Sequence, residues 1–178
     1  LRTIGTTADE IDVSLMPPGG TVPRVFVEDG TDAEFVERCV VNGHFGSPIY
    51  FAAMLERWPH LCAAGVAAEA DAPPGGVVIA CGRGCDRTGL ISFVLLALAG
   101  VSAADIAADW ALSVERLAPR DETYAEVLAA LLANEGTTVE ACITETLARF
   151  DVAQRLGGGG LTTAQLARVR ERLTAPAG

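Results

Sequence analysis

The sequence lacks any excess of positive charge. It carries 13 basic residues against 23 acidic ones, for a formal net charge of −10 at pH 7. Proteins that bind nucleic acid through its phosphates need clustered Lys and Arg, so we expect no nucleic-acid partner. The imbalance also gives no long-range attraction for an anionic substrate. Any phosphate site must therefore be a local arrangement of donors.

Long hydrophobic runs, a signal peptide and a disulfide framework are missing too. The longest apolar run, from Leu90 to Val101, is shorter than the roughly 20 residues that span a bilayer, and it predicts a buried helix. No basic segment followed by an apolar one opens the chain; because it starts with Leu1 and not Met, we expect that upstream residues have been lost.

The 5 cysteines are irregularly spaced, which predicts a cytoplasmic protein. The 2 histidines have no paired ligands for zinc, so we expect no metal site.

What is present indicates one globular domain over residues 1–178, since half of the 178 residues are hydrophobic. The β-branched segments 25–27 and 77–80 predict strands, the second buried on both faces. The apolar spacing predicts a helix over 49–61 and an Ala-rich helix that stops at 72–76. Everything after Asp86 reads as helix. We therefore predict an α/β fold, with a small, mostly parallel sheet flanked by helices and a helix-rich C-terminal half.

Local signals place the helix ends in the second half of the chain. Gly100 predicts a C-terminal stop, and Ser102 has the spacing of a capping residue for the next helix. Further helices are predicted over 122–134 and 139–156, followed by a turn at 157–160. Thr162 and Gln165 predict a capping box that opens a last helix, through residue 173.

The segment 77–89 carries the chemistry. A predicted strand runs into the loop Cys-Gly-Arg-Gly-Cys-Asp-Arg-Thr-Gly, and the loop runs into an apolar helix. Amides that converge at a helix N-terminus favour an anion, because the unpaired N–H groups and the helix dipole both attract negative charge. The same field would hold Cys81 as its nucleophilic thiolate.

The neighbours of Cys81 meet the other needs of phosphoryl transfer. Arg87 can grip two phosphoryl oxygens with its planar guanidinium, and the Thr88 hydroxyl can donate to the Cys81 sulfur. Gly82 and Gly84 let the backbone approach the phosphoryl oxygens closely. The loop lacks the Gly-Lys-Ser/Thr of a nucleotide-binding P-loop, which excludes an NTPase.

These residues resemble the signature loop of the protein tyrosine phosphatases, Cys-x5-Arg followed by Ser or Thr, and more narrowly that of a bacterial branch that continues Asp-Arg-Thr-Gly. The matching positions are Cys81, Gly84, Asp86, Arg87, Thr88 and Gly89. Segments 106–113 and 160–166 are similar to the family's later helices, and Leu1-Arg2 with Glu10 resembles its early Asp-Leu-Arg…Glu segment. The resemblance implies a tyrosine-phosphatase-like fold whose first strands lie upstream.

The resemblance also implies residue roles. Asp86 would be the general acid for the leaving group and then the base for the hydrolytic water, with no metal or cofactor. Two positions depart from the family: Ala80 stands where it has His, and Cys85 where it has Lys or Arg. Arg83 replaces part of the missing positive charge. We therefore expect Gly82, Arg83, Gly84, Cys85 and Thr88 to bind the substrate phosphate more weakly than in the family.

Other residues have simpler interpretations. Cys85 is either a resolving thiol for Cys81 on oxidation or an inert substitution. The remaining cysteines, Cys39, Cys62 and Cys142, are expected in or near the core. Segment 58–60, Trp-Pro-His, resembles an acid loop without its Asp and is expected to be a structural helix end. His44 is expected in an exposed loop.

The function predicted from the sequence is phosphomonoester hydrolysis, with phosphotyrosine in a protein as the first substrate and Cys81 as the nucleophile. Two alternatives stay open: a catalytically impaired phosphate-binding pseudophosphatase, and a dual-specificity or phosphoinositide phosphatase. The sequence does not predict an oligomeric state.

Overall fold

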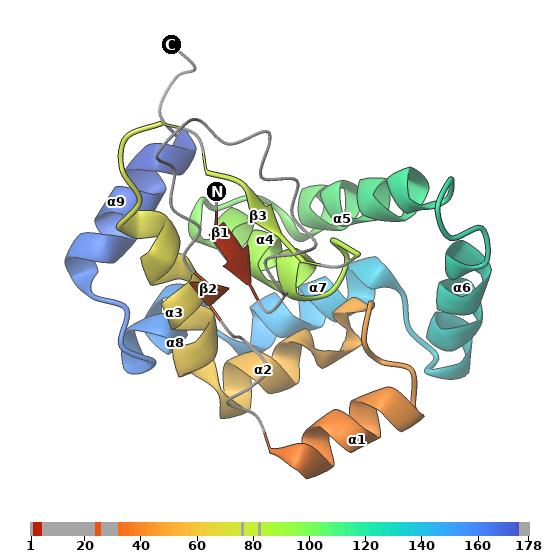
Figure 1. Cartoon of the computed structure of the whole chain (residues 1–178). Helices are drawn as coiled ribbons and strands as arrows, with labels where there is room; N and C mark the ends of the chain where they lie inside the picture. Colours follow the sequence, from red (N-terminus) through yellow and green to blue (C-terminus); the bar gives the residue numbers. More distant parts are fainter. Residues whose placement is uncertain (1, 5–23, 26–31, 76, 82, 175–178) are drawn as a thin grey trace.

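The computed structural model describes residues 2–4, 24–25, 32–75, 77–81 and 83–174 (Figure 1). Its helices are α1 Ala33–Val41, the 3-10 helix η3 Pro48–Tyr50, α2 Phe51–Arg57, α3 Pro59–Ala70, α4 Arg87–Leu98, α5 Ala103–Leu117, α6 Tyr124–Asn134, α7 Val139–Arg149, α8 Val152–Gly158 and α9 Thr163–Thr174. Its strands are β1 Arg2–Ile4, β2 Arg24–Val25 and β3 Ile79–Ala80.

Helices dominate the described part of the chain, and this overturns the predicted fold class. The three strands pair in parallel in the order β2-β1-β3, but each has only two or three residues. The α/β fold with a sheet flanked by helices is therefore wrong as a description of these residues. The reason is that segment 77–80 is not buried on both faces as predicted. Val78 is 54% exposed and β3 is only half-buried, so this strand does not form the core of a covered sheet. The apolar side chains that the described residues bury come almost entirely from helices.

Helix α4 lies at the centre of the helical packing. Its sequence is apolar on every side, as expected of a helix that is surrounded by others. It contacts α3, α5, α8, α9 and β3 (Figure 1). Leu90, Ile91 and Val94 are fully buried there. The predicted buried helix is confirmed, and its first residue, Arg87, directly follows the loop with the candidate site.

Two of the predicted helices are interrupted. The helix predicted over 49–61 stops at Trp58, because Pro59 fits the first position of α3 and cannot continue α2. The helix predicted over 139–156 breaks at Phe150, whose backbone is extended, and the Asp151 side chain caps α8 by accepting from the Gln154 amide at 2.9 Å. The turn predicted at 157–160 begins later, since α8 continues to Gly158.

The short-range capping predictions are confirmed. Gly100 follows α4 with a positive φ of 79°, and Ser102 accepts a hydrogen bond from the Asp105 amide at 3.2 Å. Thr162 and Gln165 form the reciprocal capping box of α9, with the two amide bonds at 3.0 and 3.2 Å.

Helix α9 holds the connection between α3 and β3. The Arg172 guanidinium donates to the carbonyls of Ala72, Pro73 and Gly75 at 3.0 to 3.1 Å. Arg168 donates to the Ala70 carbonyl at 3.2 Å, at the end of α3. The chain that enters the strand before Cys81 is therefore fixed by residues about a hundred positions later.

The remaining predictions for single residues had mixed outcomes. Cys39 and Cys62 are buried and Cys142 is half-buried, as predicted. His44 is less exposed than predicted, because its Nε2 pairs with Glu135 at 3.1 Å and its side chain is only 19% exposed. Segment 25–27 is described only as far as Val25, the end of β2; Phe26 and Val27 lie outside the described residues, as does Glu10.

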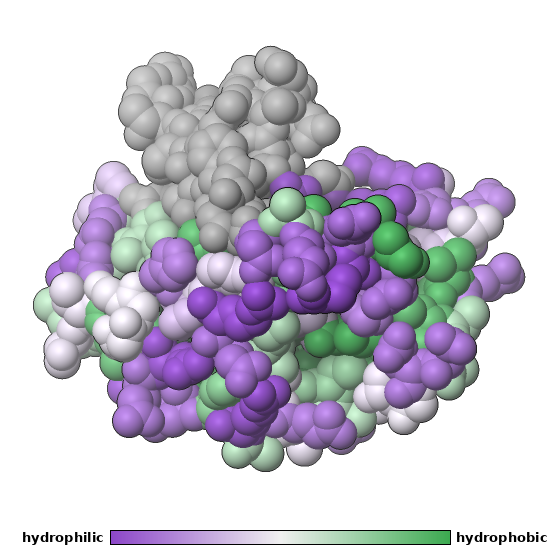
Figure 2. Space-filling view, turned by 90° about the horizontal axis from the view of Figure 1, so that it is seen from below, coloured by the Kyte–Doolittle hydropathy of each residue, from purple (hydrophilic) through white to green (hydrophobic). Residues whose placement is uncertain are grey.

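The described surface is mostly hydrophilic on the face seen from below (Figure 2), and its hydrophobic residues gather on the side where α6 lies. On α6, Val127 is 62% exposed. None of the helices in the described ranges combines the length and the hydrophobicity that a membrane crossing requires.

Candidate active site

The candidate site is the loop between β3 and α4. Cys81 follows β3 directly and is half-buried. The chain turns at Gly84, whose φ of +85° favours glycine, and this turn lets the Gly84 amide donate to the Cys81 sulfur at 3.3 Å. Gly82 lies outside the described residues. The turn therefore directs a backbone donor at the sulfur of the predicted nucleophile.

The N-terminus of α4 is left open toward this loop. Asp86 occupies the N-cap position, but its side chain makes no capping hydrogen bond to the first amides of the helix. Those amides and the positive end of the helix dipole are therefore available to an anion. Arg87, the first residue of α4, lies close enough to Asp86 to lower the pKa of that carboxyl.

Asp86 is held in a largely buried position. Burial raises the pKa of the Asp86 carboxyl, because the charged form loses its contact with water. The Tyr50 hydroxyl, Arg87, the Gly46 amide and Arg83 offset part of this rise in pKa. A carboxyl whose pKa is raised retains its proton more readily, which is the state that a general acid needs.

Cys85 lies in the core, beneath the loop. Its side chain is fully buried, and burial raises the pKa of its thiol, partly opposed by a hydrogen bond with Tyr124. The Trp110 indole of α5 donates to the Cys85 carbonyl at 3.1 Å. This close approach requires Gly89, because a Cβ there would lie 2.9 Å from the Trp110 Nε1. The loop therefore presents only the backbone of residue 85 to a ligand.

The last two predicted site residues differ in their surroundings. The Thr88 hydroxyl is buried and has no hydrogen-bond partner among the described residues, so the predicted bond to Cys81 is not formed here. Arg83 is exposed; its guanidinium lies 3.6 Å from the Asp121 carboxylate and 5.8 Å from the centre of the Tyr124 ring. Arg83 is therefore an exposed, positively charged residue of the loop.

Comparison with known proteins decides the family. A family model described as the tyrosine phosphatase family matches residues 49–175, which include the whole loop and the helices around it. The chain belongs to the tyrosine phosphatase family. No curated protein and no solved structure matches it. Membership supports phosphatase activity in general, and it implies a phosphorylated substrate.

Residues that the sequence did not single out surround this tyrosine phosphatase loop. Tyr50 and Gly46 face Asp86 from the segment that leads into α2, and Tyr124 reaches Cys85 from the start of α6. Both tyrosines of the chain are therefore beside the loop. In a chain with only 6% aromatic residues, their scarcity was a signal that sequence reading could have used.

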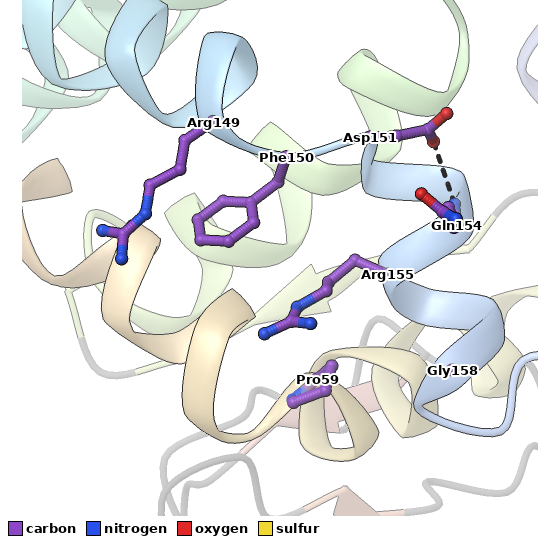
Figure 3. Close-up of a pocket in the computed structure, with 7 residues that line it drawn as sticks. All are labelled: Pro59, Arg149, Phe150, Asp151, Gln154, Arg155 and Gly158. Atoms are coloured by element: carbon purple, nitrogen blue, oxygen red, sulfur yellow. Dashed lines mark hydrogen bonds between the residues drawn. The ribbon is translucent and has the colours of Figure 1, made fainter.

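A cavity of about 540 Å³ is lined by residues of α3, α7 and α8 and of the segment between α7 and α8 (Figure 3). There the Phe150 ring lies between the guanidiniums of Arg149 and Arg155, 5.0 and 5.4 Å from its centre. Arg155 donates to the carbonyls of Leu55 and Glu56 at 2.9 and 2.6 Å. Arg155 thus joins α8 to the end of α2, and Arg149 joins α7 to it through an ion pair with Glu56. None of the predicted site residues lines this cavity.

Proposed function

We propose that this chain is a protein-tyrosine phosphatase that hydrolyses phosphomonoesters through a cysteinyl-phosphate on Cys81, within a single domain over residues 1–178. The observation that carries the proposal is the turn at Gly84, which directs a backbone N–H at the Cys81 sulfur beside the open N-terminus of α4. The same backbone amides then stabilise both the charged nucleophile and the substrate phosphate.

In the first step, the Cys81 thiolate attacks phosphorus and the bond from phosphorus to the phenolic oxygen breaks. Asp86 gives its proton to that oxygen, which leaves as the neutral phenol. The α4 amides and the Arg87 guanidinium stabilise the three equatorial oxygens as charge develops on them. Burial of Asp86 favours the protonated starting state that this step needs.

In the second step, water attacks the phosphorus of the cysteinyl-phosphate and the S–P bond breaks. Asp86, now ionised, takes a proton from the water, so Cys81 returns as a thiolate and inorganic phosphate leaves. The cycle needs a reduced Cys81, and all five cysteines are free. The reducing cytoplasm predicted from the cysteine pattern suits this requirement.

The test is turnover of aryl phosphates and phosphotyrosine peptides in fresh reductant, compared with Cys81→Ser. We expect the variant to lose activity by at least about 10⁴-fold, because no other residue supplies the nucleophile. Rapid acid quenching of the wild-type protein with labelled substrate should trap one phosphate per chain on Cys81. Equal rates for the two proteins would refute the proposal.

The second candidate is a phosphate-binding module with impaired catalysis. It is favoured by the position of Cys85, which gives the loop a buried thiol where the family has a cation. In this case the wild-type protein and Cys81→Ser are equally inactive, while both bind inorganic phosphate in a calorimetric titration. A substrate panel of phosphotyrosine, phosphoserine and phosphoinositides separates a tyrosine-specific enzyme from a dual-specificity or lipid phosphatase.

A further inference from the structure

Tyr124 makes contacts with three parts of the candidate site. It is the first residue of α6 and is almost completely buried. Its hydroxyl donates to the Gly46 carbonyl, and it shares a hydrogen bond with the Cys85 thiol. The Arg83 guanidinium lies over its ring, 5.8 Å from the centre.

Two donors order these contacts. The Tyr124 hydroxyl donates to the Gly46 carbonyl, and the Cys85 thiol donates to the Arg83 carbonyl at 4.0 Å. The contact between the Tyr124 hydroxyl and the Cys85 sulfur opposes part of the rise that burial causes in the pKa of the Cys85 thiol. The result is a buried chain of contacts from Cys85 through Tyr124 to Gly46.

Both ends of this chain touch the proposed general acid. Cys85 directly precedes Asp86 in the loop, and the Gly46 amide faces the Asp86 carboxyl. The fit between residues 46 and 124 is close: a Cβ on Gly46 would lie 3.5 Å from the Tyr124 ring and hydroxyl. A shift of the hydroxyl would therefore move Asp86 from two sides at once.

We propose that Tyr124 is a positioning residue for the general acid: by joining Cys85 to Gly46 through its hydroxyl, it fixes the two segments that hold the Asp86 carboxyl beside the leaving group. This inference rests on the proposed phosphatase function. Tyr124 itself touches no reacting atom. Its effect is on where the acid lies, and a misplaced acid slows proton transfer far more than it weakens binding.

The test is Tyr124→Phe, which keeps the ring and removes the hydroxyl. Proton donation matters most for a poor leaving group, so we compare phenyl phosphate, whose phenol has a pKa of about 10, with 4-nitrophenyl phosphate. We expect kcat to fall by about tenfold for phenyl phosphate and by no more than about twofold for the nitrophenyl ester, with KM nearly unchanged.

The matched control is Thr146→Val. Thr146 is also buried, and its hydroxyl also donates to a backbone carbonyl, that of Cys142 at 2.7 Å, but it lies on α7, outside the loop. We expect it to lower stability by a similar amount and to leave the ratio of the two substrates unchanged. If Tyr124→Phe does not fold, Cys85→Ala removes the same hydrogen bond from its other end and should change the ratio in the same direction.

Amide hydrogen exchange separates this inference from the proposed function. In Tyr124→Phe, protection should fall at residues 42–47 and 83–87 and stay at the control level elsewhere. An active enzyme whose Tyr124→Phe variant keeps the wild-type substrate ratio overturns the positioning role. If the wild-type protein is as inactive as Cys81→Ser, the proposed function fails, and unchanged protection of residues 42–47 would then overturn the structural connection as well.

Discussion

The substitution Gly89→Ala tests whether the close packing of α4 against Trp110 of α5 stabilises the candidate site. An added Cβ would lie 2.9 Å from the Trp110 Nε1, 3.3 Å from its Cδ1 and 3.6 Å from the Phe51 ring. Carbon contacts normally begin near about 3.5 Å, so the indole has to move by several tenths of an ångström. The bond from this indole to the Cys85 carbonyl, 3.1 Å long, lies in the path of that movement.

The magnitude follows from three terms. Overpacking of a well-packed core typically lowers the free energy of unfolding by about 1–3 kcal/mol. A weakened hydrogen bond to Cys85 removes about 1 kcal/mol more, while the preference of a helix for Ala over Gly returns up to about 1 kcal/mol. We expect a net loss of about 2 kcal/mol, which for a domain of this size lowers Tm by about 4–8 °C.

The assay is thermal unfolding followed by circular dichroism, with Gly157→Ala as the matched control. Gly157 also lies in a helix, but a Cβ there meets nothing within 4 Å, so this variant should gain about 0.5–1 kcal/mol. In a Trp110→Phe background, which leaves more room, Gly89→Ala should lower stability much less. If Gly89→Ala melts at or above the temperature of the Gly157→Ala control, the reasoning is wrong.

Three further predictions concern Asp86, Arg155 and the relative reactivity of two cysteines. Because burial raises the pKa of Asp86, the contribution of this carboxyl to stability is fully present below its ordinary pKa of about 3.9 and is lost as pH rises through the raised value. Asp86→Asn should therefore melt above the wild type at pH 7, with the difference closing near pH 3, while kcat falls at least about 100-fold; a lower melting temperature at pH 7 would contradict the burial argument. Arg155→Ala should lower the free energy of unfolding in urea by about 1–2 kcal/mol with kcat/KM unchanged, because it releases the last carbonyls of α2, whereas Gln154→Ala should have little effect. Iodoacetamide should label Cys81 of the native protein well before Cys62, since burial raises the pKa of the Cys62 thiol to about 12; peptide mass spectrometry checks the order, and equal rates would count against it.

The sequence predicted best what short stretches determine. Ser102 and Gln165 each accept from an amide three residues away, so their spacing alone was enough to place the helix ends. The order of strand, loop and helix around Cys81 was predicted for the same reason, since a β-branched run, a glycine turn and an apolar run follow each other directly. The family model extends well beyond this local pattern, since it matches residues 49–175.

What the sequence could not predict depends on distant contacts. The Tyr124 hydroxyl donates to the Gly46 carbonyl across 78 positions of sequence, and no motif near either residue predicts this contact. The fold class failed for a similar reason: an apolar run such as 77–80 shows that burial is favourable, but not whether a sheet or other helices will cover it. The break at Phe150 was missed because the cap at Asp151 competes with an otherwise continuous helical pattern.

The hydrogen bonds from Arg172 to the segment 72–75 determine when the candidate site can form during synthesis of the protein. The segment that leads into β3 leaves the ribosome early, but the Arg172 side chain that anchors it belongs to α9 and arrives about a hundred residues later. Until then the carbonyls of Ala72, Pro73 and Gly75 lack the Arg172 donors, and closing so long a loop slows the final step of assembly. Catalytic competence should thus appear only once translation has passed α9, so nascent chains released before that point would carry the complete signature sequence without a formed site.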